Sequence, residues 1–387
     1  MTNYLISTVR RHISVSETSG YLYTLDFENQ LLLQRTAFIE PPYREFDNNP
    51  RGGLRGCRGI SLNTEQILIA NASYIYRFDA QWNQLGEISH PSCNAIHDIL
   101  LENSSVWLAS ARNDLCVHLD FAGNILEFIN FRDHALAFND LGWHPPKVLN
   151  SDTIFKGLID FRDPRTNDDE TYNRAHVNSI CSLKNGDKLI SLGLVLNDKF
   201  AQLLKIKKWL YQAGCWQYIL SINRKIRNIL KLGKGMHTDL IFSPPQGKSA
   251  VIRLAKNGIL SLCLAIDNVT TPSHSLLPLP DDTVIYLNTT LGHVIHFDSA
   301  SGVILSSTKV TDGFLRGAAL LPDGNIIMGS NGKLIVFNLK ELKISNVILL
   351  TSDPNESVYD IKELPNHFAL PPLALAERTS NVLRCTG

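Results

Sequence analysis

Histidine, arginine and tyrosine side chains that could do chemistry recur along this 387-residue chain, many of them at intervals of about 40 residues. Each heads a short apolar stretch that is followed by a polar turn and a second apolar stretch. The seven positions are Arg58, His97, His176, His237, His274, Arg316 and Tyr359. Imidazole can act as a nucleophile, a general acid or base, or a metal ligand, and guanidinium groups bind oxyanions through paired N–H donors. Their joint chemistry depends on whether the fold brings them together.

The stretches that carry these residues resemble inner hairpins of propeller blades, because a four-stranded blade needs about 40 residues. We count seven, including LIFSPPQGKSAVI after His237 and DIKELPNHFAL after Tyr359. Outer hairpins follow several of them, with a strand that alternates apolar and polar residues and ends at Asp or Asn, side chains that open turns. These ends are Asp79, Asp120, Asp298 and Asn338. We therefore predict an all-β fold, a single seven-bladed β-propeller domain over residues 1–387.

The two ends of the chain are expected to share the last blade. After Tyr359 only about two strands of chain remain, whereas residues 20–35 have the outer-hairpin pattern with no inner hairpin before them. Pairing these N-terminal strands with the C-terminal ones closes the ring and removes an open sheet edge.

Two intervals are too long for one blade and predict insertions. The insertion at 127–172 is polar and rich in turn formers, which is typical of an excursion over one face. The insertion at 203–232 mixes Trp209 and Trp216 with lysines and arginines. We interpret it as an amphipathic helix packed on a blade, and the alternative is contact with an anionic membrane or a protein partner.

The channel mouth is the predicted site, because the innermost strand of every blade lines the channel and strand starts meet at one end. We expect His97, His176 and His237 to be catalytic. The loop after the second strand of the His97 blade adds an arginine and an asparagine, and strand alignment places Asn178 and Asp239 level with His97. The expected substrate-binding residues are Arg58, Arg112, Asn113, Asn178, Asp239, Arg316 and Tyr359.

Three functions are compatible with these residues. The first is an enzyme acting on an anionic or phenolic small molecule, with no cofactor. The second is a metalloenzyme that holds iron or another first-row divalent metal on the axis through His97, His176, His237 and His274. The third is a non-catalytic propeller that binds a protein or a glycan. The arginines favour an anion, because a metal site seldom has extra positive charge beside it.

The motifs resemble those of the arylsulfotransferase-type propeller family. The matching segments are His97-Asp98-Ile99, Ser110-Ala111-Arg112-Asn113, His176-Val177-Asn178-Ser179-Ile180 and His237-Thr238-Asp239. The resemblance implies a propeller and a transferase that moves a sulfuryl group between phenolic compounds through a histidine intermediate. In this chain the Ser-x-Arg-Asn segment follows the first His motif, and the His-Val-Asn-Ser motif has no arginine after it.

Composition limits the partners and the compartment. Lys plus Arg and Asp plus Glu number 37 each, so no overall field attracts nucleic acid, and we expect a small-molecule substrate instead. The seven cysteines are scattered without a CxxC pair, which favours a reduced protein. Because no signal peptide and no transmembrane run is evident, a cytoplasmic protein is expected.

Overall fold

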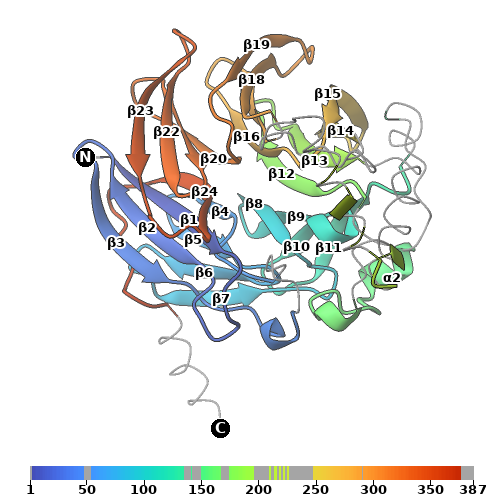
Figure 1. Cartoon of the computed structure of the whole chain (residues 1–387). Helices are drawn as coiled ribbons and strands as arrows, with labels where there is room; N and C mark the ends of the chain where they lie inside the picture. Colours follow the sequence, from blue (N-terminus) through green and yellow to red (C-terminus); the bar gives the residue numbers. More distant parts are fainter. Residues whose placement is uncertain are drawn as a thin grey trace.

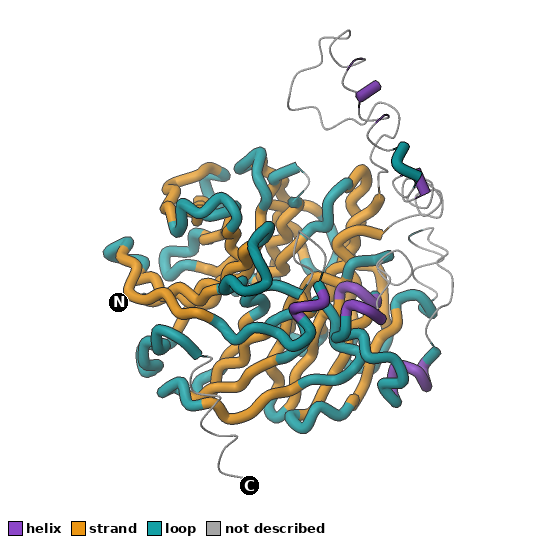
Figure 2. The backbone as a smooth tube through the Cα atoms, turned by 60° about the horizontal axis from the view of Figure 1, so that its bottom comes forward, coloured by secondary structure: helices purple, strands orange, loops and turns teal. Residues whose placement is uncertain are grey.

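Six four-stranded antiparallel sheets surround a common centre in the computed structural model (Figure 1). The structure describes residues 2–47, 54–134, 141, 150–166, 174–195, 209–210, 213–215, 218, 221–222, 225, 247–289 and 291–375. The fold is all-β, as predicted, and it is a β-propeller. Figure 2 shows from another side that strands make up the body of the described chain. None of the helices in this described part has the length and apolarity to cross a bilayer.

Each sheet is one blade, whose strands are named in order from the channel outward. Five blades follow the chain order. The first is β4 (Ile60–Leu62), β5 (Gln66–Ala70), β6 (Ile75–Asp79) and β7 (Gln84–Ile88). The second is β8 (Ile96–Glu102), β9 (Ser105–Ser110), β10 (Leu115–Asp120) and β11 (Ile125–Asn130). The third is β12 (Val177–Ser182), β13 (Lys188–Val195), β14 (Gly247–Leu254) and β15 (Leu260–Val269).

The remaining blades complete the ring. The fourth is β16 (His274–Pro278), β17 (Thr283–Asn288), β18 (His293–Asp298) and β19 (Ile304–Lys309). The fifth is β20 (Leu315–Leu320), β21 (Ile326–Ser330), β22 (Lys333–Asn338) and β23 (Lys343–Leu349). The sixth is β24 (Glu356–Leu364), β1 (Asn3–Arg10), β2 (Tyr21–Asp26) and β3 (Leu31–Ala37). Short helical turns are η1 (Arg44–Phe46), η2 (Ala111–Asn113), α2 (Ser151–Phe155) and η3 (Pro164–Thr166).

The predicted count of seven blades is wrong, and one segment explains the error. LIFSPPQGKSAVI was interpreted as an inner hairpin, but its described part belongs to β14, which pairs with β13 on one side and β15 on the other. An apolar stretch, a turn and another apolar stretch look alike in the first and the third strand of a blade. Only the pairing partners distinguish them, and those are set by tertiary structure.

One predicted insertion lies between strands of the fold, and the other begins inside a strand. Residues 203–232 fall between β13 and β14, and the predicted amphipathic helix there lies almost wholly outside the described residues. The interval 127–172 includes the end of β11 and then α2 and η3. Its Ile154 and Phe161 are buried against the second blade, where Phe161 N–H donates to Pro91 O at 2.8 Å.

Both termini share the sixth blade, where β1 pairs with β24 and with β2 (Figure 1). The expected closure is present, but residues 20–35 supply only part of it. A single C-terminal strand joins three N-terminal ones, and Leu5 and Ile6 of β1 are fully buried. After β24, the C-terminal segment runs beside β3, and the N–H of Ala37 in β3 donates to Leu373 O at 2.9 Å.

Turns between outer strands follow the predicted side-chain chemistry. Asp120 Oδ1 accepts from the N–H of Ala122 at 2.9 Å and of Asn124 at 2.8 Å. Asp79 makes the equivalent pair of bonds in the first blade.

The hydrophobic core is divided among the interfaces between adjacent blades. One such cluster joins Tyr4, Ile6 and Leu25 of the sixth blade to Ile327 and Val336 of the fifth. Because apolar side chains fill the spaces between sheets, polar side chains of the innermost strands are left to meet at the axis.

Candidate functional site

Irregular backbone marks the innermost strands where they reach the channel mouth. Register shifts occur between Ile96 and Ile99 in β8, Val177 and Ser179 in β12, His274 and Leu276 in β16, and Arg316 and Ala318 in β20. In β24 the residue Tyr359 is skipped in the pairing with β1. A bulge adds an unpaired residue, bends the strand and redirects its side chains. These bends coincide with the strand starts that the sequence singled out.

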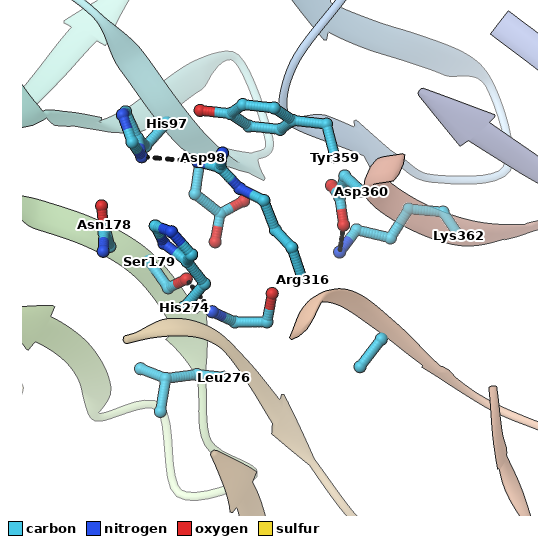
Figure 3. Close-up of a pocket in the computed structure, with 12 residues that line it drawn as sticks. His97, Asp98, Asn178, Ser179, His274, Leu276, Arg316, Tyr359, Asp360 and Lys362 are labelled. Carbon is cyan, nitrogen blue, oxygen red and sulfur yellow. Dashed lines mark hydrogen bonds and ion pairs between the residues drawn. The ribbon is translucent and has the colours of Figure 1, made fainter. Parts of the chain in front are cut away.

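Side chains from five of the six blades converge at this mouth (Figure 3). The His97 ring centre lies 4.8 Å from that of His176, 5.8 Å from that of His274 and 5.7 Å from that of Tyr359. The rings of His176 and His274 are 6.5 Å apart. The predicted convergence of these residues is therefore present in the structure.

Arg316 occupies the centre of the cluster. Its Nη2 donates to His97 Nδ1 at 2.7 Å, and its guanidinium carbon lies 3.3 Å from the centre of the Tyr359 ring. The side chain is 5% exposed and forms no ion pair with a carboxylate of the described chain. Burial, together with the charges of Arg11 and Arg58, lowers the pKa of Arg316 to about 9, although Tyr359 acts in the opposite direction.

The three imidazoles are neutral at physiological pH. Burial, followed by the charges of Arg316 and Arg112, lowers the pKa of His176 to about 3. The pKa values of His97 and His274 are also well below the ordinary histidine value, for the same two reasons of burial and neighbouring Arg316. Because a guanidinium can only donate, His97 Nδ1 must be an acceptor and its proton must sit on Nε2.

Two further arginines surround the cluster. Arg58 is buried, donates from Nη1 to Ile96 O at 3.3 Å, and has its guanidinium 5.6 Å from the Tyr359 ring centre. Arg112 lies on η2 and is also buried, and its charge contributes to lowering the pKa of both His176 and Arg58. The mouth is therefore densely cationic.

The structure places the other expected site residues in different surroundings. Asn113 is fully buried and is committed to its own turn, because its Nδ2 donates to Ser92 O at 2.7 Å and its Oδ1 accepts from Ser110 Oγ at 2.5 Å. Asn178 does line the channel cavity. His237 and Asp239 lie outside the described residues.

A second polar layer lies next to the first and was not anticipated. Lys362 Nζ pairs with Asp360 Oδ1 at 3.2 Å, and Asp98 lines the same cavity. Burial, with the charge of Asp360, raises the pKa of Asp98 to about 7, against the opposing charge of Lys362.

This layer also ties the blades together. Asp98 Oδ2 accepts from the N–H of Ile180 in the next blade at 3.1 Å, and Asp360 Oδ2 accepts from that of Ile60 at 2.9 Å. Ser275 Oγ likewise accepts from the N–H of Gly317 at 2.8 Å. Each of the three acceptors directly follows one of the predicted channel-mouth residues in the sequence. That regular position is the sequence signal from which this second layer could have been predicted.

Asp114 is another functional candidate that the sequence did not reveal. Its carboxylate accepts from the backbone N–H groups of Arg174, Ala175 and His176 at 2.7–3.0 Å and pairs with the buried Arg132 at 2.9 Å. His176 has a φ of 52°, a left-handed conformation that is unfavourable for a non-glycine residue. Asp114 therefore holds the backbone that presents the His176 imidazole.

A narrow cavity of about 20 Å³ lies between the two layers. Its walls include His97, Asp98, Asn178, His274 and Tyr359 (Figure 3). Such a volume holds about one water molecule. Within the described residues, no group of three or more His, Cys, Asp or Glu side chains is arranged to hold a metal ion.

Comparison with solved structures reveals similarity over almost the whole chain. A protein of unknown function from Bacteroides caccae superposes with a TM-score of 0.51 at 10% identity, covering 94% of this chain and 99% of that one. A chain of a nidogen–laminin complex gives a TM-score of 0.52 at 8% identity, covering 93% and 97%. The WD40 β-propeller domain of Doa1 gives 0.45 at 10% identity, covering 95% and 99%.

The likeness is one of fold alone. No protein-family model and no curated protein matches the chain. The six sheets around the channel support the propeller, whereas the resemblance to arylsulfotransferase-type propellers finds no support beyond that fold. Evidence for function must therefore come from the cluster itself.

Proposed function

We propose that the channel mouth binds the anionic group of a small molecule, with Arg316 at the centre and Arg58 and Arg112 beside it. The observation that carries the proposal is the buried Arg316 guanidinium, which has no carboxylate partner in the described chain. Burying a cation without a counter-ion costs several kcal/mol. An oxyanion bound through paired N–H donors would offset that cost, which is the geometry that arginine provides.

The neutral imidazoles give this site a capacity for catalysis. His97 Nε2–H is a donor for an oxyanion or for a departing oxygen. His176 and His274, whose pKa values are lowered by burial and by Arg316, stay unprotonated near neutral pH. We therefore infer an enzyme that acts on an anionic small molecule.

The metal alternative is less favoured by the same geometry. Arg316 engages His97 Nδ1 at 2.7 Å, and Nε2 then carries the proton, so neither nitrogen of His97 is free to ligate. A cation bound nearby would also be repelled by the arginines. Sulfuryl transfer stays a prediction. Because it implies that the site binds sulfate, the test below compares the binding of sulfate with that of phosphate.

The proposal is tested by calorimetric titration of the full-length protein with inorganic sulfate and with inorganic phosphate at constant ionic strength. We expect saturable binding of at least one anion, weakened tenfold or more by Arg316→Gln. The matched control is Arg77→Gln, because Arg77 packs on Phe121 away from the channel. Absence of binding by a folded wild-type protein, or equal loss in both variants, would overturn the proposal.

A further inference from the structure

Three polar atoms on side chains that line the 20 Å³ cavity have no hydrogen-bond partner among the described residues. They are Asn178 Oδ1, from β12, His274 Nδ1, from β16, and Tyr359 Oη, from β24. All three side chains are buried, with 2% of Asn178, 4% of His274 and 5% of Tyr359 exposed. A buried polar atom without a partner costs about 1–3 kcal/mol, so an acceptor of this kind indicates a bound donor.

The hydrogen-bonding sense of Asn178 is fixed by its surroundings. Its Nδ2 donates to Ser273 O, which leaves Oδ1 as an acceptor directed at the cavity. Gly193 packs against this amide, and a Cβ at Gly193 would clash with Nδ2. The amide therefore depends on a glycine for its position.

His274 supplies the second acceptor. It is neutral, and we assign its proton to Nε2, which leaves the Nδ1 lone pair available. The ring lies close to Asn178 and to the Arg316 guanidinium (Figure 3). A species that satisfies both atoms must carry two hydrogens and fit a volume of about 20 Å³. Water meets both conditions.

We propose that this cavity holds one water molecule, which donates to Asn178 Oδ1 and His274 Nδ1, and that this water is the nucleophile for hydrolysis of a small phosphate or sulfate ester. The inference rests on the proposed function, because the ester would be held by Arg316. With both hydrogens engaged, the oxygen lone pairs are left to face the channel. Orienting a nucleophile in this way supplies a large part of a catalytic rate.

The step balances without any co-reactant. The water oxygen forms a bond to phosphorus or sulfur, while the bond from that atom to the ester oxygen breaks and the ester oxygen leaves with the electron pair. His274 Nδ1 takes the proton of the water. The leaving oxygen departs as an anion, to which His97 Nε2–H can donate a hydrogen bond, and solvent then protonates that oxygen and takes the proton from His274.

The first test is a crystal structure of the full chain at about 1.5 Å resolution or better. We expect density for one water within hydrogen-bonding distance of Asn178 Oδ1 and His274 Nδ1. An empty cavity, or a protein group that fills it, would overturn the inference and leave the anion proposal intact.

The second test measures hydrolysis of 4-nitrophenyl phosphate and 4-nitrophenyl sulfate in ¹⁸O-labelled water. We expect turnover of at least one ester with ¹⁸O in the released inorganic anion, and a loss of kcat of about 100-fold or more in Asn178→Ala and His274→Gln. The affinity for the free anion should change by less than threefold. The control is Asn346→Ala on the outermost strand β23.

The outcomes separate the two proposals. A wild-type protein that binds anion but hydrolyses neither ester contradicts the nucleophilic water alone. Label recovered in the nitrophenol contradicts the attack at phosphorus or sulfur. Failure to bind any anion contradicts the proposed function and the inference together. If Asn178→Ala does not fold, Gly193→Ala serves instead, because it displaces the amide while keeping Asn178 and His274.

Discussion

Arg316 on β20 and His97 on β8, two blades that are not neighbours in the ring, are joined across the channel by a hydrogen bond of 2.7 Å. The bond sets the tautomer of His97 and brings a guanidinium into a site with three neutral imidazoles. It is the contact that links the imidazoles of the mouth to its central arginine.

Substitution of Arg316 by Gln should release the His97 tautomer. In the wild-type protein we expect ¹⁵N NMR to identify His97 as neutral, with the proton on Nε2, and in the variant we expect a mixture of tautomers or a pKa that moves back toward 6.5. His118, which contacts Ser105 and Trp107 instead, should be unchanged in the same spectra. A wild-type His97 protonated on Nδ1 would contradict the assignment.

The imidazoles should make the protein less stable in acid. The folded-state pKa of His176, about 3, is below the ordinary value of 6.5, so below pH 6.5 the unfolded chain binds a proton that the folded chain does not. The stability that the protein owes to a neutral His176 is therefore fully present above about pH 6.5 and is lost as pH falls toward 3. Urea denaturation between pH 4 and 7 should show the loss, and His176→Gln should flatten the profile.

Asp98 should act in the opposite direction over a similar range. Its folded-state pKa, about 7, is raised above the ordinary 3.8, so between these values the folded chain binds the additional proton and stability decreases as pH rises. Asp98→Asn should remove this decrease. If Asp98→Asn and His176→Gln change the profile in the same sense, the pKa assignments are wrong.

Removal of the Asp114 carboxylate should destabilise the fold and the site together. Asp114→Ala removes the carboxylate that pairs with the buried Arg132, and breaking such a pair costs about 3–5 kcal/mol. The substitution also removes the acceptor that holds the strained backbone at His176. The affinity of the folded fraction for the anion should therefore fall. The control is Asp312→Ala, which breaks the exposed pair with Lys309 and should leave the denaturation midpoint unchanged.

The strand that joins the two ends of the chain should be essential for cooperative folding. Ile6 of β1 is fully buried between the fifth and sixth blades, and Ile6→Ala should lower the free energy of unfolding by about 2–5 kcal/mol. Leu31→Ala on the outermost strand β3, where the side chain is 56% exposed, should have a much smaller effect. Equal effects of the two substitutions would contradict a closure that depends on β1.

The sequence by itself determined that the fold is an all-β propeller, though not the number of its blades, and identified most residues of the cluster. Strand alternation, Asp-opened turns and strand starts at Arg58, His97, His176, His274, Arg316 and Tyr359 are local patterns, and each corresponds to a strand and a place in the structure. These features depend on neighbours within a few residues, so they are readable from the chain alone.

Tertiary structure decided what depends on partners distant in sequence. Whether β14 begins a blade or continues one is set by its pairing with β13 and β15, and this decided the count of six. The bulges that turn strand starts into the channel, and the bonds of Asp98 and Asp114 to neighbouring elements, likewise join residues tens of positions apart. Charge and burial at the mouth exist only once the blades close, and they set the tautomer of His97 and keep the imidazoles neutral.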